Sequence, residues 1–240
     1  MKLFALGDLH LSLDRKFDIE NASACHGYKP MAVFGDGWKD HTNRIYEHWC
    51  QVVGEDDLVL VPGDISWAMK LADTVFDFDF LHRLPGKKLL LRGNHDYWWH
   101  SPTKIRQLLP PSIAILQNDA YFVRDIAIAG TRLWTLPDAG DADSNDKKIF
   151  ERELIRLELS LKAAKGRPTV VMFHYMPVNE RCDRNAVTDL LQQYPVQTVV
   201  YGHLHDQSHR IAVEGDHFGM AFHLVSGDYL AFCPKCICEL

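Results

Sequence analysis

The chain has 240 residues, of which 47% are hydrophobic and 24% charged, and its formal net charge is −6 at pH 7. This length suits one globular domain whose core needs no cross-links, and the composition excludes a largely disordered or collagen-like chain. The acidic balance argues against a protein that mainly binds the phosphate backbone of nucleic acid or anionic lipid. The unusual feature is the set of 13 histidines, because histidine is the commonest metal ligand and titrates near neutral pH.

Signals for export, membrane insertion or disulfide formation are weak in this sequence. The apolar run at residues 3–6 is too short for a signal peptide, and no stretch approaches the roughly 18 apolar residues of a membrane span. Six cysteines are too few for a disulfide framework in a chain of this size. We therefore expect a cytoplasmic protein without membrane contact. Because no linker or repeat interrupts the chain, we also expect a single domain over residues 1–240.

The predicted elements alternate between short apolar strands and amphipathic helices. Such a pattern is typical of a layered α/β protein whose sheet is covered on both faces. Three short strands in succession and a terminal hairpin break the alternation and indicate a second sheet or a mixed edge. In chain order we expect a strand at 3–6, a helix at 38–53, a strand at 58–61, a helix at 73–84, strands at 88–91, 113–116, 121–124 and 126–129, a helix at 147–164, strands at 169–173 and 198–201, and a hairpin over 208–225 that turns at 214–216.

The long polar stretch at residues 11–37 fits neither periodicity. Loops of this length are uncommon in compact domains and are usually functional or mobile. We expect either a lid or wall of the substrate site, in which His26 is a candidate substrate contact, or a surface excursion packed by Met31, Val33 and Phe34.

Five of the apolar runs end in side chains that bind metals. These clusters lie at residues 7–10, 63–66, 93–96, 174 and 202–205, and four of them contain a glycine just before the polar residues. Glycine permits sharp turns and close backbone approach. Because ligands of α/β sheets bind beyond the carboxyl ends of the strands, the five clusters are expected to converge on one site.

The ordered pattern Asp-x-His, Gly-Asp, Gly-Asn-His-Asp, His and Gly-His-x-His resembles the calcineurin-like metallophosphoesterase family. The resemblance spans residues 7–205 and implies an α/β fold, a four-layer α/β/β/α sandwich of two mixed sheets flanked by helices, with a binuclear metal site at strand ends. It also implies the ligands of the two ions: Asp8, His10 and His205 on one, Asn94, His174 and His203 on the other, and Asp64 bridging both.

The resemblance further implies a phosphoester hydrolase in which a metal-bridging hydroxide is the nucleophile. His95 is then placed to contact the scissile phosphate and to act as general acid, with Asp96 orienting its imidazole, and Asn94 is a further candidate substrate contact. A donor set that mixes nitrogen and oxygen suits manganese, iron or zinc better than magnesium or calcium. We therefore expect two divalent or trivalent transition-metal ions, manganese before iron or zinc.

The substrate class stays open at this point. The expected partner is a small phosphorylated molecule, a phosphomonoester or phosphodiester, and no dedicated nucleic-acid binding is expected. The alternatives are a catalytically weak binding scaffold with the same fold, a nucleotide or cyclic-nucleotide phosphodiesterase, and a protein phosphatase of the same superfamily. Because an interface cannot be distinguished from a core face in this sequence, the oligomeric state stays open too.

Two positions depart from patterns within this superfamily. Many members continue the second block as Gly-Asp-x-x-Asp, whereas Trp67 stands at the last position here. The lipid A precursor pyrophosphatases carry Arg where this chain has His95, which disfavours that specialised activity.

Several other residues allow two interpretations. Arg132 follows an apolar run and is either a bidentate phosphate clamp or part of a surface salt bridge. The aromatic residues 97–99 either stack on a substrate or pack in the core, and core packing is favoured. The acidic residues 141–145 are expected to cap the helix at 147–164, and Cys233, Cys236 and Cys238 are expected to be incidental thiols on a tail.

Overall fold

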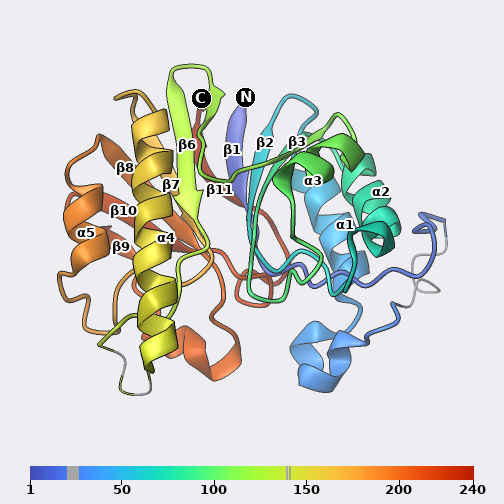
Figure 1. Cartoon of the computed structure of the whole chain (residues 1–240). Helices are drawn as coiled ribbons and strands as arrows, with labels where there is room; N and C mark the ends of the chain where they lie inside the picture. Colours follow the sequence, from blue (N-terminus) through green and yellow to red (C-terminus); the bar gives the residue numbers. More distant parts are fainter. Residues whose placement is uncertain (21–26, 139, 141) are drawn as a thin grey trace.

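The computed structural model describes residues 1–20, 27–138, 140 and 142–240, so His26 lies outside the described residues. Two sheets pack face to face and are covered by helices on their outer sides (Figure 1). On one side lie α1 (His41–Val52), α2 (Val75–Arg83) and α3 (Pro102–Leu108), and on the other α4 (Ser144–Ala163) and α5 (Ala186–Leu191). The expected four-layer α/β/β/α sandwich is confirmed.

The first sheet has the strand order β11-β1-β2-β3-β4. Its strands β1 (Lys2–Ala5), β2 (Leu58–Pro62), β3 (Lys87–Leu91) and β4 (Ile113–Ile115) run parallel, whereas β11 (Lys235–Glu239) lies antiparallel on the outer edge of β1. The expectation of a cysteine-bearing tail is wrong in this respect, because Cys236 and Cys238 belong to β11 and pair with Phe4 and Leu3.

The second sheet has the order β5-β6-β7-β8-β10-β9. Its bounds are β5 (Tyr121–Val123), β6 (Ile126–Thr131), β7 (Thr169–Phe173), β8 (Val196–Tyr201), β9 (Gly215–His217) and β10 (Met220–Leu224). The expected second sheet is confirmed, and both sheets are mixed, since β5 and β9 are antiparallel to their neighbours.

The terminal hairpin lies later in the chain than the sequence indicated. Residues 206–211 form a 3₁₀ helix, η5 (Asp206–Ile211), and the hairpin joins β9 to β10. Its turn consists of Phe218 and Gly219, which both have positive φ angles of 54° and 79°. Two residues with positive φ match the right-handed twist of the flanking strands and make a tight hairpin turn.

Three apolar layers hold the sandwich together, one between the sheets and one under each set of helices. Alternate residues of a strand point to opposite faces of its sheet. In β2, Leu58 and Leu60 therefore lie between the sheets, whereas Val59 and Val61 lie beneath the helices. Because both faces are covered, every residue of β2 is buried, which explains why the strands read as continuous apolar runs.

The predicted helices are present with shifted boundaries. A 3₁₀ turn, η3 (Asp36–Trp38), precedes α1, and the 39% exposure of Val52 shows that this residue is not on the buried face. A second 3₁₀ turn, η4 (Leu71–Thr74), precedes α2. The expected cap of α4 is confirmed, because the Asp143 carboxylate accepts hydrogen bonds from the backbone N–H groups of Asn145 and Asp146. Two short helices, α3 and α5, were not predicted.

The described part of the long loop at 11–37 packs on the first sheet. Leu11, Leu13, Phe17 and Met31 are buried in the core beneath the helices. The expected packing by Val33 and Phe34 is wrong, since these two residues of η2 (Met31–Phe34) are 73% and 48% exposed. In the described ranges no helix is both long enough and apolar enough to cross a membrane.

Candidate metal centre

The strands that carry the polar clusters point their carboxyl ends to one edge of the sandwich, the lower edge in Figure 1. The strands β1, β2 and β3 of the first sheet lead to Asp8, Asp64 and Asn94, and β7 and β8 of the second sheet lead to His174 and His203. Parallel pairing within each sheet places these ends side by side. Residues far apart in the sequence therefore meet across the junction of the two sheets.

The backbone at this edge is strained. Asp8, His10, Asp64 and His203 all have φ between 45° and 71°, the left-handed region that side chains other than glycine rarely adopt. Each such residue costs on the order of 1–3 kcal/mol and persists only where its surroundings impose it. The turns aim the four side chains back into the junction between the sheets.

Glycines at two strand ends make room for the carboxylates. A Cβ atom on Gly93 would overlap a carboxylate oxygen and the backbone nitrogen of Asp64, and a Cβ atom on Gly202 would overlap a carboxylate oxygen of Asp8. Only glycine can bring the backbone this close.

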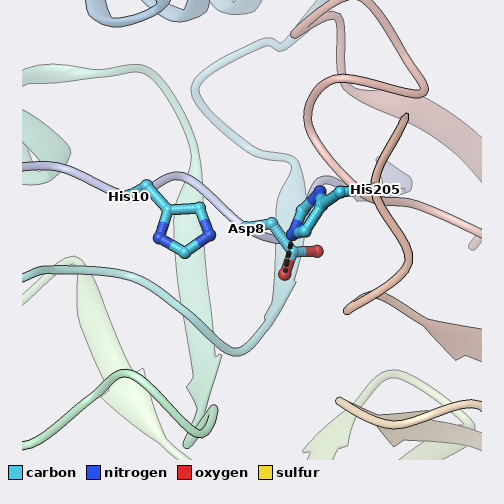
Figure 2. Close-up of side chains that lie close together, drawn as sticks. All are labelled: Asp8, His10 and His205. Atoms are coloured by element: carbon cyan, nitrogen blue, oxygen red, sulfur yellow. Dashed lines mark ion pairs between the residues drawn. The ribbon is translucent and has the colours of Figure 1, made fainter. Parts of the chain in front are cut away.

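The first group of candidate ligands consists of Asp8, His10 and His205, whose ligand atoms all lie within 4.8 Å of one another. Figure 2 shows the side chains of His205 and Asp8 beside each other, with 3.5 Å between Nε2 and Oδ1, and His10 on the other side of Asp8. The Nδ1 atom of His10 is buried and has no hydrogen-bond partner among the described residues. The other nitrogen of this ring, Nε2, faces Asp64 Oδ2 at 3.7 Å.

The second group consists of Asp8, Asp64 and His174, with ligand atoms again within 4.8 Å of one another. His174 Nδ1 lies 3.0 Å from the Pro62 carbonyl oxygen and is therefore the protonated nitrogen. Its Nε2 faces Asn94 Oδ1 at 2.6 Å and Asp64 Oδ2 at 3.5 Å. His203 is close by, since its ring centroid lies 5.0 Å from that of His174.

Asp8 belongs to both groups, and Asp64, a member of the second, also approaches the first. Its Oδ2 atom is 3.7 Å from His10 Nε2 in one group and 3.5 Å from His174 Nε2 in the other. Its Oδ1 accepts a hydrogen bond of 2.8 Å from the backbone N–H of His95. The structure thus brings all seven predicted ligands to one edge, with Asp64 in the central position.

Burial and mutual contact shift the pKa values of the candidate ligands. Burial, followed by the nearby Asp8 carboxylate, raises the pKa of Asp64 to about 8. Burial opposes ionisation of Asp8 as well, yet its pKa lies below the ordinary value because three imidazoles, His205 foremost, face it. Burial lowers the pKa values of His10, His174 and His203, so these rings are neutral and offer lone pairs near pH 7.

His205 is the exception among the imidazoles. Burial disfavours its charge, but Asp8 and Asp228 outweigh burial and raise its pKa to about 10. Two buried carboxylates thus draw a proton onto a ring that would otherwise be neutral. Neutral imidazoles, carboxylates and an amide oxygen around buried negative charge are a donor set that fits divalent transition metals.

Comparison with known proteins identifies the family. A family model described as calcineurin-like phosphoesterase matches residues 1–207. The chain belongs to the calcineurin-like phosphoesterases.

Individual relatives of this calcineurin-like chain are distant. The Gene 66 protein of Mycobacterium phage L5 is 30% identical over 89 residues, which are 37% of this chain and 37% of that protein. Among solved structures, a phosphopantetheinyl hydrolase from Mycobacterium tuberculosis aligns with a TM-score of 0.53 and 15% identity over 94% of this chain and 88% of its own. A protein of unknown function from Aquifex aeolicus aligns at 0.49 and 13% over 98% and 94%. The likeness to the hydrolase is one of fold alone.

The candidate catalytic residues of this calcineurin-like phosphoesterase lie beside the candidate metal ligands. The ring centroid of His95 is 5.8 Å from that of His10, and burial lowers its pKa to about 4. The expected contact between Asp96 and the His95 ring is not found in the described part of the chain. Asp96 accepts hydrogen bonds from the backbone N–H groups of residues 65, 66 and 93 and from the Trp98 indole. The Nδ1 of His95 instead lies 3.2 Å from the Tyr97 hydroxyl oxygen.

Two further residues of the site were missed from the sequence. Asp228 Oδ1 lies 2.8 Å from His205 Nδ1, which leaves Nε2 of that ring to face Asp8. Trp67 stacks on His10 at a centroid distance of 4.9 Å and lies 4.5 Å from His95. Asp228 follows an apolar strand and a glycine, as Asp8 and Asp64 do, so the same signal could have found it.

The sequence allowed two interpretations for the aromatic residues after His95 and for Arg132. Core packing of the aromatic residues after His95 is confirmed for Trp98 and Trp99, which are 0% and 1% exposed. Of the two interpretations of Arg132, the salt bridge is present, at 3.8 Å from Glu153, but it is not at the surface, because the Arg132 side chain is only 13% exposed. Arg132 does not join the metal ligands and instead lines a neighbouring cavity.

Proposed function

We propose that this protein is a binuclear metal-dependent hydrolase of phosphomonoesters or phosphodiesters. Family membership establishes a metal-dependent phosphoesterase in general terms. The observation that carries the finer proposal is Asp64, a buried carboxylate with one oxygen within 3.7 Å of an imidazole from each group of ligands. A carboxylate so placed suits two ions better than one.

In this proposal the two ions share Asp64. Asp8, His10 and His205 hold one ion, and Asn94, His174 and His203 hold the other. When bound, such a pair supplies a water of lowered pKa as nucleophile and positive charge against the phosphoryl oxygens. Hydrolysis forms one P–O bond from water and breaks the ester P–O bond, and the leaving oxygen takes up a proton. Nitrogen and oxygen donors together favour manganese, iron or zinc.

His95 is the proposed source of that proton. With a pKa of about 4, its half-buried ring is neutral at pH 7 before substrate arrives. A phosphate group beside the ring adds negative charge, which raises the pKa of an imidazole and favours its protonation. The Tyr97 hydroxyl at Nδ1 and the Trp67 ring limit the orientations of this imidazole. Asp96 supports it indirectly, since its carboxylate fixes the turn that carries His95.

We further propose small phosphorylated substrates in a reducing compartment. The five cysteines in the described ranges are all free thiols, which supports the cytoplasmic setting expected from the sequence. A protein-phosphatase activity would require a surface that docks a polypeptide, and no observation favours one.

The decisive experiment combines metal analysis with a substrate panel. The protein is reconstituted with Mn²⁺, its metal content is measured, and it is assayed on alkyl phosphates, diesters, nucleotides and phosphopeptides. We expect about two ions per chain and hydrolysis of at least one ester class, both lost in Asp64→Ala and kept in the exposed control Asp216→Asn. Two bound ions without any hydrolysis would favour the binding scaffold. Absence of both would refute the proposal.

A further inference from the structure

A cavity lined by three arginines lies near the candidate metal centre. A cavity of about 100 Å³ is lined by Arg92, Arg132 and Arg156 together with one carboxylate, that of Glu153. It lies where β3, β4 and β6 end, beside α4, which packs on β6, on the same edge of the sandwich as the candidate metal ligands. Its volume suffices for a few water molecules or one phosphate-sized anion.

The single carboxylate is shared by several donors. Glu153 is 1% exposed, accepts a hydrogen bond of 2.6 Å from Arg156 Nη1 and another from the Thr131 hydroxyl, and lies 3.8 Å from Arg132 Nη2. The Nε atoms of Arg92 and Arg132 are buried and have no hydrogen-bond partner in the described part of the chain. Three guanidinium groups therefore line a cavity that holds one acid, and the two buried Nε donors are unused.

Among the described residues that line the cavity, Glu153 is the one carboxylate. Asp96 is four residues after Arg92, but both oxygens of its carboxylate already accept hydrogen bonds from backbone N–H groups. Buried charges without partners are costly, and guanidinium groups pair bidentately with phosphate or carboxylate.

The cavity is connected to the metal centre through the backbone. Arg92 is two residues before Asn94, and the Arg132 carbonyl accepts hydrogen bonds of 3.2 and 3.1 Å from the N–H groups of His174 and Tyr175. Exposed residues in the lining, among them His100, open the cavity to solvent. The cavity and the candidate metal centre are therefore built on neighbouring residues.

We propose that Arg92, Arg132 and Arg156 bind a second anionic group of the substrate, a phosphate or carboxylate attached at a distance from the scissile phosphoester. This inference rests on the proposed function and narrows it to substrates that carry such a second group. The arginines then determine specificity, whereas the metal centre performs the hydrolysis.

The test compares alkyl phosphates with alkanediol bisphosphates and phosphorylated hydroxy acids of the same chain lengths. At one chain length we expect a second anionic group to raise kcat/KM about tenfold, as one charge-assisted hydrogen bond provides. The bisphosphate and hydroxy-acid arms show whether phosphate or carboxylate is preferred.

Arg156→Gln and Arg132→Gln should remove this gain and leave kcat/KM for the alkyl phosphates within about twofold of the parent value. The matched control is Lys148→Gln, which removes one exposed positive charge from α4, the helix that carries Arg156. This variant should leave kcat/KM unchanged for both classes of substrate.

Failure of the inference is distinct from failure of the proposed function. Equal kcat/KM for all substrates, or equal losses on both classes in the arginine variants, would overturn the second site while hydrolysis persists. If no ester is hydrolysed, the inference is tested by the rise in Tm that inorganic phosphate causes in the metal-free protein. Phosphate should raise the Tm of the parent and of Lys148→Gln by more than that of Arg156→Gln, and an equal rise in all three would overturn the inference. Arg156 is 34% exposed, so its replacement is tolerated even if Arg132→Gln does not fold.

Discussion

The two sheets contribute different chemistry to the metal centre. Among the candidate ligands, both carboxylates, those of Asp8 and Asp64, follow strands of the first sheet, whereas the second sheet contributes the imidazoles of His174, His203 and His205. The first sheet alone would leave the two carboxylates close together without these three rings. Assembly of the site therefore requires the sheets to pack.

Specific contacts couple packing to the site. The His174 ring of the second sheet reaches the Pro62 carbonyl of the first at 3.0 Å, and the Gly7 N–H donates to the Val225 carbonyl at 2.7 Å. The apolar layer between the sheets sets their separation. The strained turns at Asp8 and His203 then meet across this junction, where the His203 N–H donates to the Asp8 carboxylate.

The largest effect is expected from removing the central carboxylate of the first sheet. Asp64→Asn keeps the shape of the side chain but leaves Asp8 as the one carboxylate among the proposed ligands. Both ions should therefore bind weakly, and kcat/KM should fall by about a thousandfold or more. Metal content and hydrolysis are measured together, with Asp216→Asn as control. Retention of two ions per chain would show that Asp64 does not bridge.

A smaller effect is expected at His95, which also belongs to the first sheet but is not a proposed ligand. His95→Gln should keep both ions and lower kcat by about 10²–10⁴-fold, the usual contribution of an acid or base. Metal content distinguishes this variant from Asp64→Asn. If His95→Gln loses metal as well, its proposed role is wrong.

A third, smaller effect is expected from changing Asp228, which orients His205 of the second sheet. Asp228→Asn keeps the size of the side chain but weakens the charge that orients the ring at 2.8 Å, so metal affinity should fall about 10–100-fold. Titration with Mn²⁺ measures the change. Excess Mn²⁺ should restore the rate, and a loss that excess metal leaves uncorrected would contradict an orienting role.

The smallest effect on hydrolysis is expected at Asp77, whose main effect is on the pH dependence of stability. Burial raises the pKa of this carboxyl to about 7, although Ser66 Oγ at 2.5 Å and the Leu13 N–H at 2.8 Å donate to it. The folded state thus holds this proton more tightly than the unfolded state. Its contribution is complete below pH 4 and is lost as the pH rises through about 7.

The matched variant is Asp77→Asn, which cannot titrate. Chemical denaturation between pH 4 and 8 should show the parent losing up to about 4 kcal/mol relative to the variant, an upper limit from the size of the pKa change. Parallel stability curves for the two proteins would contradict a raised pKa at Asp77.

Local patterns in the sequence were sufficient for an α/β protein and for the convergence of the candidate ligands, whereas the four-layer arrangement was implied by the family resemblance. An apolar strand followed by a glycine and a metal-binding side chain is visible without knowledge of the neighbours. The register of parallel strands then places Asp8, Asp64 and Asn94 together automatically.

What the sequence did not reveal depends on contacts between distant segments. The role of Asp228 follows from a loop after β10 that returns to His205, and Trp67 is recognised as part of the site only when it stacks on His10. The strand β11 alternates cysteine with other residues and has no helical or strongly apolar signal, so only its pairing with β1 identifies it. The unpaired arginine nitrogens likewise require three dimensions to be recognised.

The pairing of β11 with β1 has a consequence for how the chain reaches its native state. The first strand, which leads to Asp8, obtains its second neighbour only when the last strand has been made, since Lys2 pairs with Glu239. Contacts of such long sequence separation form slowly. Until then the free edge of β1 is open to wrong partners. During synthesis, the strand that leads to Asp8 therefore stays unpaired on this side until β11 has left the ribosome.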